Sequence, residues 1–320
     1  MLGFRLGFVR TCLLVLPGFV GLAAAACSSS SSRGGFDAPP ADTTSSSGAS
    51  GNTSGFVGGD SGVPPVGDGC TDAAKLVYVL SLEGDLYSFA PADKKFTKVG
   101  ALDCTLDGKT FTTVSMAVDR NAVAWVNMRD ALSFTAESVM FKVDTKTASC
   151  TPTNIKGSWG GMGFSTNAGT TDQETLYMIG GTGPTGALLT VDFTKEKINT
   201  VATLPEQVDL ELTGTGDGRL YGFLQSKPLA IAAVDKSTAV FSQKAPLSTV
   251  QQPAAPMFAF SFWGGDFYVY TATDPSASKT TTVSRYRPSD KSVDNAYMTN
   301  IGFHIVGAGV STCAPTAAPK

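Results

Sequence analysis

An aromatic residue returns at nearly regular intervals along the middle of this chain, each time within a short β-type run. The five positions are Tyr78, Trp125, Tyr177, Tyr221 and Tyr268, and the steps between them are 47, 52, 44 and 47 residues. A period of roughly 40 to 50 residues is typical of one four-stranded blade of a β-propeller. The repeat therefore predicts an all-β protein with five blades and four strands in each blade.

The sequence that follows each aromatic repeats as well. A second strand leads into a turn in every repeat, at Ala90, Asp144, Asp192, Asp235 and Arg287. Asp suits three of these turns because its carboxylate can accept a hydrogen bond from the backbone two residues on, while Pro91 and Pro288 preset φ in the other two. The local sequence thus predicts one strand–turn–strand unit that is repeated five times.

The first and last parts of the chain complement each other. A further strand precedes the aromatic in four repeats, but a Gly- and Pro-rich segment precedes Tyr78. The C-terminus instead carries an extra strand-like segment, HIVGAGVST, after the fifth repeat. We therefore expect the last strand of the chain to complete the first blade, so that no blade interface is left unmatched.

The cysteines agree with this closure. Cys70 precedes Tyr78 by eight residues and Cys313 follows the extra segment, so a disulfide between them would take the place of a hairpin turn. Cys104 and Cys150 are then paired by elimination only, and a bond between Cys70 and Cys104 would contradict the closure. None of the four has the CxxC spacing of a structural zinc site.

The N-terminus has the layout of a secretory signal. Arg5 and Arg10 give it a positive start, and residues 11–23 are mostly apolar. Small residues follow in the sequence AAAAC. The apolar run is shorter than the roughly 20 residues that a membrane-spanning helix needs.

This segment, residues 1–26, resembles a bacterial lipoprotein signal. The resemblance implies that Cys27 is lipidated and becomes the first residue of the mature protein, and Ser28 resembles the type that is sorted to the outer membrane. Ala24 departs from the pattern, because such signals usually carry Leu there. Ordinary cleavage after Ala26, giving a secreted or periplasmic protein, is the alternative.

Composition divides the remainder of the chain. Residues 27–69 are rich in Ser, Gly and Pro and have almost nothing to bury, so we expect a flexible tether. Residues 70–316 form the predicted propeller, and residues 317–320 are a short tail. The formal charge is −3 and Lys and Arg are scattered, which argues against nucleic acid as a partner. We expect a monomer that meets the membrane through its lipid anchor only.

Residues with catalytic chemistry are few. The chain has one histidine, His304, which rules out multi-histidine metal sites and leaves a single candidate base for a Ser/His/Asp arrangement. Its neighbours Phe303 and Ile305 favour a structural imidazole, with ligand binding as the alternative. We expect no metal and no cofactor.

Two acids at the start of the innermost strand of the fourth blade raise a different possibility. Asp209 and Glu211 are separated by one residue and therefore lie on the same face of a strand. Some five-bladed propellers are glycosidases with carboxylates from different blades around a central pocket, an analogy of fold only. A hydrolase needs opposed carboxylates and a general acid of raised pKa. The other blades supply no matching acid, so acids solvated at the rim of the channel are the alternative.

Aromatic residues in the loops that lead into the innermost strands favour a binding site. Phe111, Trp159, Phe258 and Phe303 should gather at one mouth of the channel, where they could stack on a sugar or hold a peptide. Arg129 lies in a loop predicted to open on the same face and is a candidate anion contact. Packing between blades is the alternative role for these aromatics.

Over nearly its whole length the chain resembles predicted bacterial lipoproteins that join a lipidated signal, a Ser/Gly tether and one β-propeller. The resemblance rests on the segments AAAAC, LVYVLSLEGDLYSF, ELTGTGDGRLYGF, FAFSFWGGDFYVY and IVGAGVSTC, and no WD or kelch signature is present. It implies a fold and an address in the outer membrane, and it assigns no functional residue. We therefore expect a non-catalytic module that binds an envelope protein, a peptide or a glycan, with a carbohydrate-active hydrolase using Asp209 and Glu211 as the alternative.

Overall fold

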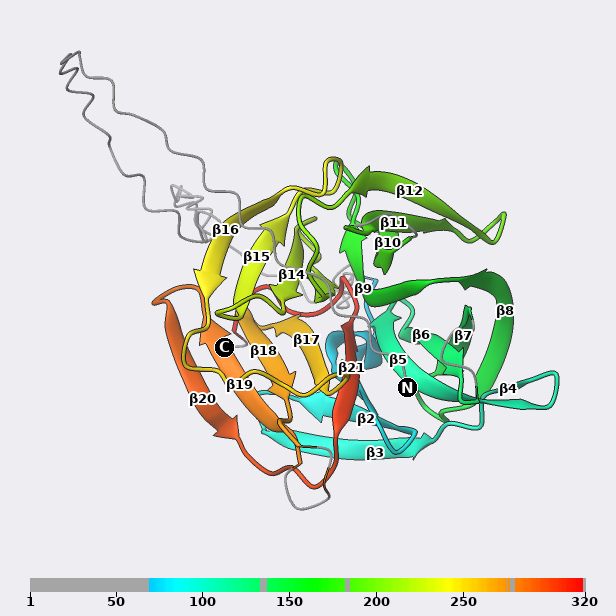
Figure 1. Cartoon of the computed structure of the whole chain (residues 1–320), viewed down its shortest axis with the longest axis horizontal. Helices are drawn as coiled ribbons and strands as arrows, with labels where there is room; N and C mark the ends of the chain where they lie inside the picture. Colours follow the sequence, from blue (N-terminus) through cyan, green and yellow to red (C-terminus); the bar gives the residue numbers. More distant parts are fainter. Residues whose placement is uncertain (1–68, 133–136, 182–184, 275, 277–279, 319–320) are drawn as a thin grey trace, which may run out of the picture. The chain divides into compact units, whose positions relative to one another are not determined.

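The strands form five sheets arranged as the blades of a ring (Figure 1). The structure is a computed structural model, and it describes residues 69–132, 137–181, 185–274, 276 and 280–318. Four sheets have four strands, and the fifth has an additional short strand, β4 (Thr105–Leu106). The predicted five-bladed β-propeller is confirmed. The signal, Cys27 and the tether lie outside the described residues.

All pairings within the blades are antiparallel. Blade 1 consists of β21 (Ile305–Val310), β1 (Val77–Ser81), β2 (Asp85–Ala90) and β3 (Lys95–Ala101). Blade 2 consists of β5 (Lys109–Val118), β6 (Val123–Asp130), β7 (Ser138–Asp144) and β8 (Cys150–Gly157). Blade 3 consists of β9 (Trp159–Thr166), β10 (Glu174–Gly180), β11 (Ala187–Asp192) and β12 (Lys197–Thr203). Blade 4 consists of β13 (Leu210–Gly214), β14 (Leu220–Leu224), β15 (Ala230–Val234) and β16 (Phe241–Pro246). Blade 5 consists of β17 (Phe258–Trp263), β18 (Asp266–Thr271), β19 (Thr282–Arg287) and β20 (Ser292–Met298).

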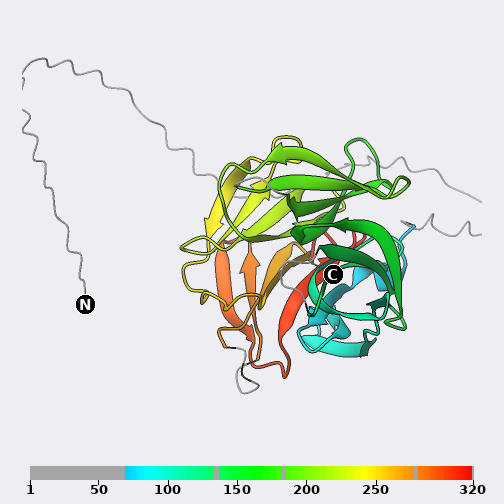
Figure 2. The same ribbon diagram turned by 45° about the vertical axis from the view of Figure 1, so that its right-hand side comes forward.

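The last strand of the chain closes the ring, as the sequence predicts. Strand β21 pairs with β1, with Tyr78 opposite Gly309 and Val77 opposite Val310. Figures 1 and 2 show this strand in red between blade 5 and the blue start of the described chain. Each innermost strand contacts the innermost strands of both neighbouring blades, in the closed order β5, β9, β13, β17 and β21.

Apolar cores lie between neighbouring blades, and the repeated aromatics belong to them. Strand β1 is buried on both faces: Val77 and Val79 pack toward blade 5, whereas Tyr78 and Leu80 pack toward blade 2. Similar clusters join blades 2 and 3, 3 and 4, and 4 and 5. All five aromatics of the repeat are less than 9% exposed. The repeat is therefore a packing signature, because the second strand of every blade lies between two sheets.

The turns between the third and fourth strands of the blades are held as the sequence predicts. In the three turns that open with Asp, the carboxylate accepts the N–H two residues on. The pairs are Asp144 with Lys146, Asp192 with Thr194 and Asp235 with Ser237, at 2.7, 3.1 and 2.9 Å. These hydrogen bonds help to hold the pKa of all three carboxyls below the usual value.

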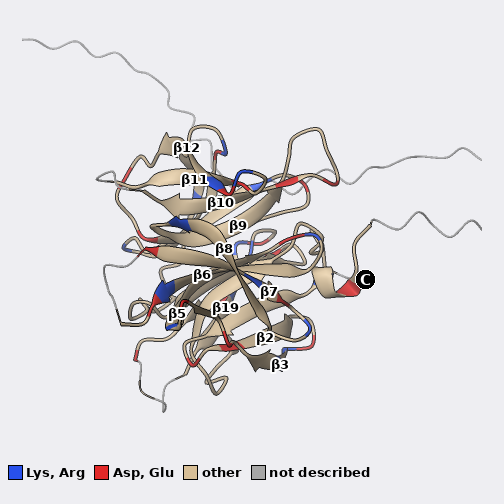
Figure 3. Ribbon diagram, turned by 90° about the vertical axis from the view of Figure 1, so that its right-hand side faces the viewer, with Lys and Arg blue, Asp and Glu red and all other residues tan. Residues whose placement is uncertain are grey.

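Charged residues of both signs are interspersed along the strands and loops (Figure 3). The ion pairs between described residues are mostly exposed, as between Lys98 and Asp85 or Lys244 and Glu206. Exposed pairs contribute little to stability, typically about 0–1 kcal/mol. The propeller is thus held mainly by its interblade cores, its strand pairing and its disulfides.

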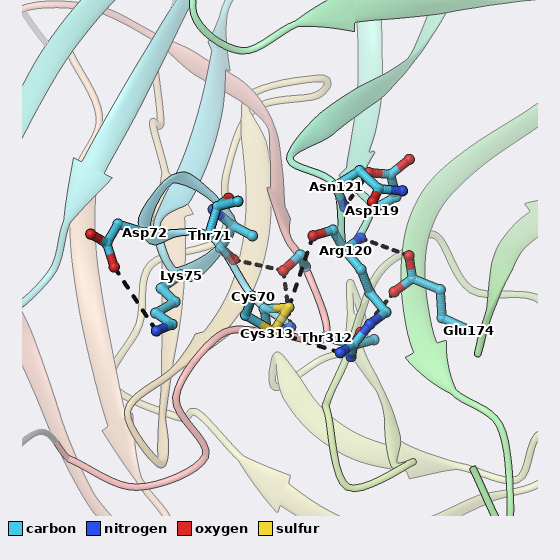
Figure 4. Close-up of a disulfide and its surroundings, with 12 residues drawn as sticks. Cys70, Thr71, Asp72, Lys75, Asp119, Arg120, Asn121, Glu174, Thr312 and Cys313 are labelled. Atoms are coloured by element: carbon cyan, nitrogen blue, oxygen red, sulfur yellow. Dashed lines mark hydrogen bonds and ion pairs between the residues drawn. A yellow bond between two sulfur atoms is a disulfide. The ribbon is translucent and has the colours of Figure 1, made fainter. Parts of the chain in front are cut away.

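The two predicted disulfides are present. Cys70 and Cys313 are bonded with their Cα atoms 5.7 Å apart, beside the short 3-10 helix η1 (Asp72–Lys75) (Figure 4). The Ser311 hydroxyl donates to the carbonyl of Ala74 at 2.6 Å, which adds a hydrogen bond across the same junction. Cys104 and Cys150 join blades 1 and 2 with a Cα–Cα distance of 5.1 Å. The closing disulfide therefore fixes both ends of the ring where a hairpin turn would otherwise stand.

Around the axis, glycines let neighbouring backbones approach each other. A Cβ atom on Gly161 in β9 would lie 2.3 Å from the carbonyl oxygen of Leu210 in β13, and one on Gly309 in β21 would lie 3.0 Å from the backbone of Ala117 in β5. Only glycine permits the first of these approaches. The innermost strands are consequently close enough for side chains of blades that are not neighbours to meet.

Candidate functional site

A cavity of about 380 Å³ opens at one mouth of the central channel. Its walls come from the segments that lead into β9, β13 and β17 and from the loop between β10 and β11. The structure therefore confirms that the segments leading into the innermost strands and the loop between the second and third strands of blade 3 open on one face. Pockets that bind small molecules typically have volumes of about 300–1,000 Å³, so the cavity is at the small end of this range.

Five of the residues that the sequence singled out line this cavity: Arg129, Trp159, Asp209, Glu211 and Phe258. Arg129 lies at the end of β6, and Asp209 directly precedes β13. The Asp209 carboxylate is exposed, and the Arg129 guanidinium is half-buried. Among the described residues, neither side chain makes an ion pair or a hydrogen bond. The cavity thus presents one positive and one negative group that do not neutralise each other.

Glu211 lies in β13, and its side chain points toward the axis of the propeller. Its side chain is 4% exposed, and its Oε2 accepts a hydrogen bond of 2.8 Å from the Ser115 hydroxyl in β5. Blades 2 and 4 are not neighbours, so this hydrogen bond crosses the axis of the propeller. The backbone N–H of Met162 in β9 also donates to the carboxyl. Three innermost strands therefore meet at one acid.

Burial raises the pKa of the Glu211 carboxyl to about 8, although the hydrogen bonds from Ser115 and Met162 act in the opposite direction. The group is therefore a neutral acid at pH 7. Asp209 and Glu211 both line the cavity, but their carboxyl groups differ in exposure to solvent. Asp209 is exposed to solvent, whereas the side chain of Glu211 is buried near the axis of the propeller.

Much of the cavity wall is main chain. Gly160, Gly161, Gly180, Gly181 and Gly186 all line it. A Cβ on Gly180 would lie 2.2 Å from the carbonyl oxygen of Ser158, and Gly181 and Gly186 have positive φ values of 96° and 79°. A ligand in this cavity would meet peptide N–H and C=O groups as well as side chains.

The expectation that four aromatics gather at this mouth is only half right. Trp159 and Phe258 line the cavity, but Trp159 is 2% exposed and packs in the core between blades 2 and 3. Phe258 is half-buried and lies 6.4 Å from Phe223, measured between ring centroids. Trp159 therefore serves the core, and Phe258 is the one partly exposed aromatic ring among the described residues that line the cavity.

Phe111 and Phe303 lie elsewhere. Strand β5 begins early, at Lys109, and forms a hairpin with β4, which carries Phe111 outward to pack on Phe141 at 5.2 Å. It lines a separate depression together with Asp107. Phe303 stacks on Tyr87 with ring centroids 4.1 Å apart. Phe111 lies away from the mouth because β5 begins earlier than the sequence pattern suggested, whereas Phe303, in the segment before β21, packs on Tyr87 of β2 instead.

His304 is also outside the cavity. Its side chain is buried, and Nδ1 lies 2.9 Å from Oε1 of Glu83, on the loop between β1 and β2. The hydrogen bond to His304 is one cause that lowers the pKa of Glu83. Within blade 1, the imidazole thus links the segment before β21 to the loop between β1 and β2, in agreement with the structural interpretation.

Sequence reasoning missed the roles of Ser115, Met162, Gly160 and Gly161. Ser115 carries no signal in the sequence, because its role depends on which strand lies across the axis. Three of the wall glycines belong to the segment GGTGPTGA, but only the loop geometry shows that they line a cavity. The described residues contain no cluster of three or more His, Cys, Asp or Glu that could hold a metal ion, and no helix among them is long and apolar enough to cross a membrane.

No protein-family model matches this chain, and no curated protein is similar to it in sequence. Solved structures similar to it include TolB from Acinetobacter baumannii, at 14% identity and a TM-score of 0.41, covering 68% of this chain and 51% of that chain. The calcium-binding protein regucalcin from Agrobacterium tumefaciens has 13% identity and a TM-score of 0.41, with 63% and 65% covered. A hypothetical protein from Leishmania major has 11% identity and a TM-score of 0.42, with 70% and 77% covered.

This chain thus spans about half the length of the TolB chain and 65% of the regucalcin chain. Identities and TM-scores at this level say nothing about ligand or activity. The assignment of the fold rests instead on the strand pairing described above, in which five antiparallel sheets follow one another around a closed ring.

Proposed function

We propose that this protein is a non-catalytic binding module whose channel-mouth cavity holds a small ligand with both a carboxylate and an ammonium group, such as a free amino acid or the end of a short peptide. The observation that carries the proposal is the pair Arg129 and Asp209. They line one cavity with opposite charges, yet they form no ion pair with each other.

The chemistry of the pair fits such a ligand. A guanidinium binds a carboxylate through two parallel N–H···O bonds, and an exposed carboxylate accepts hydrogen bonds from an ammonium group. The main-chain wall adds N–H and C=O groups that suit a peptide unit. Neutral Glu211 at the edge of the axis places no second negative charge in the cavity, so the site keeps one positive and one negative group.

The alternative function is a hydrolase that acts on carbohydrate with Asp209 and Glu211. The raised pKa of Glu211 favours it, because a general acid must hold its proton at neutral pH. The burial of Glu211 favours binding instead, because a catalytic acid has to reach the leaving oxygen and this carboxyl is already held by Ser115 and Met162.

The test is titration calorimetry of the purified protein with free L- and D-amino acids and di- to tetrapeptides. Arg129→Gln and Asp209→Asn should each weaken binding by roughly 10- to 100-fold, since a hydrogen bond to a charged group contributes about 1.5–3 kcal/mol. Asp93→Asn is the matched control, because Asp93 is exposed in the turn after β2, outside the cavity.

Two results would argue against the proposal. One is that no amino acid or peptide binds, and the other is that the two cavity variants bind as well as the Asp93→Asn control. Hydrolysis of chromogenic glycosides that is lost in Glu211→Gln would support the hydrolase instead.

The proposal also includes an address at the bacterial outer membrane. It is supported by the lipoprotein-like N-terminus with Cys27 and by the two disulfides, which form in oxidising compartments. Radiolabelled palmitate should be incorporated in cells that produce the protein and not in cells that produce Cys27→Ser. Release of the unlabelled native protein into the periplasm or the medium would contradict this part.

A further inference from the structure

A second cavity, of about 530 Å³, lies in blade 5. It is bounded by β18, β19 and β20, by the loop before β17 and by the segment after β20. Among the residues that the structure describes, the two cavities share no lining residue. Of the twelve described residues that line it, ten are Thr, Ser, Asn or Gln and none carries a charge.

Two asparagines at the rim have NH₂ groups that donate to no described residue. The Thr249 hydroxyl donates to Oδ1 of Asn295 at 3.1 Å, and the Thr280 hydroxyl donates to Oδ1 of Asn300 at 2.8 Å. Each amide is thereby oriented with its carbonyl oxygen toward a threonine. The NH₂ groups of Asn295 and Asn300 form no hydrogen bond with the described residues.

The floor contains a hydroxyl without a partner. Thr271, the last residue of β18, is 5% exposed, and its hydroxyl forms no hydrogen bond with any described residue. It lines the cavity together with Val250 and Ala272. The Thr271 hydroxyl is not among the fully buried polar atoms that lack a partner, so it opens into the cavity and is available to a molecule there.

We propose that this blade-5 cavity is a binding site for an uncharged saccharide. Neutral donors and acceptors in the wall match a ligand whose polar groups are all hydroxyls or amides. The described lining residues offer no charge to an ionised ligand, which would lose its hydration without gaining an ion pair from them. This site is independent of the proposed ligand of the channel-mouth cavity.

The shape of threonine explains the preference for a sugar over a peptide. A threonine side chain carries a methyl and a hydroxyl, and a pyranose ring likewise presents C–H groups beside hydroxyls. Val250 and Ala272 add small apolar surface on the floor, sufficient for one face of a sugar ring. Hot spots for peptide and protein partners are instead enriched in Trp, Tyr and Arg, and none of the described lining residues is of these types.

The experiment is a binding screen of the purified protein by NMR and calorimetry. The probes are malto-, cello-, laminari- and xylo-oligosaccharides and oligomers of N-acetylglucosamine, with oligogalacturonates and tetrapeptides as the charged and peptide comparisons. At least one neutral series should bind at concentrations up to roughly 10 mM, near the weak limit of useful affinity.

Thr271→Val is the informative variant. It keeps the shape of the side chain and removes a hydroxyl that makes no bond with the described residues, so the fold should be retained. Its affinity for the saccharide should fall roughly fivefold or more, and Asn295→Ala at the exposed rim should have a similar effect. Asn199→Ala is the control, because Asn199 is an exposed asparagine on β12, the outer strand of blade 3.

Three outcomes would overturn the proposal. They are the absence of binding by every neutral series, a preference for the oligogalacturonate or peptide comparison, and saccharide binding that both cavity variants retain. Amino-acid binding at the channel mouth should be unchanged in Thr271→Val, and Arg129→Gln should leave saccharide binding unchanged. Failure of one site is therefore distinguishable from failure of the other.

Discussion

Replacing Glu211 with glutamine should change how the stability of the propeller depends on pH. In the folded protein, burial places the pKa of this carboxyl at about 8, whereas its ordinary value is 4.5. Between these two values the folded state holds a proton that the unfolded state has lost. The stability that comes from Glu211 is therefore fully present below about pH 4.5 and is lost as the pH rises through about 8.

The size of the effect follows from the proton linkage. One pH unit corresponds to about 1.36 kcal/mol, so from pH 5 to pH 7 the wild-type protein should lose nearly 3 kcal/mol of unfolding free energy relative to the Glu211→Gln variant. For a domain of this size, 1 kcal/mol shifts Tm by about 2–4 °C. The Tm values of the two proteins should thus move relative to each other by roughly 5–10 °C over this interval.

The assay is thermal unfolding followed by circular dichroism at several pH values from 5 to 8. The amide that Glu211→Gln introduces cannot reproduce every hydrogen bond of the acid, so a constant offset between the two proteins is expected and is not the test. The test is the slope. Parallel curves of Tm against pH would refute the assignment of a neutral, buried Glu211.

Asp266→Asn is the matched control for this experiment. Burial raises the pKa of Asp266 to about 6, and Arg285 opposes the shift from 3.8 Å away. Its contribution has the same sign as that of Glu211, but its loss is complete once the pH exceeds about 6. The Asp266→Asn variant should therefore differ from the wild type in slope only below that value, whereas Glu211→Gln should differ up to about pH 8.

Two further pairs of variants test the architecture. Gly161→Ala should destabilise the protein by about 1–3 kcal/mol or more in urea unfolding, because its Cβ would lie 2.3 Å from a backbone oxygen. Gly160→Ala should be nearly neutral, since its Cβ would lie 4.0 Å from the nearest atom, and equal losses would contradict the close packing at the axis. Removing the disulfide of Cys70 should cost up to about 5 kcal/mol and removing that of Cys104 up to about 4, because the bonded residues are 243 and 46 positions apart. A smaller loss for Cys70 would argue against ring closure as the main role of its disulfide.

The blade count could be predicted from the sequence because it depends on local chemistry that is repeated. A strand that lies between two sheets must be apolar on both faces, so the second strand of each blade carries a buried aromatic such as Tyr78 or Tyr221 at a fixed place. The turns use Asp or Pro for reasons that hold within a few residues. The missing first strand, the extra last segment and the positions of Cys70 and Cys313 then suffice to predict ring closure.

The surroundings of individual side chains could not be predicted in this way. Asp209 and Glu211 look equivalent in the sequence, yet one is exposed and the other is buried, because only Glu211 points at a serine from a blade across the axis. Phe111 does not lie at the channel mouth, where it was expected, because β5 is longer than the repeat suggests. The sequence by itself determined the repeat, the ring and its closing disulfide, since these follow from local pattern and chain connectivity, whereas it paired Cys104 with Cys150 by elimination only. Only the tertiary structure decided the cavities and the protonation of Glu211, because burial and the approach of strands distant in the chain are properties of the packed ring.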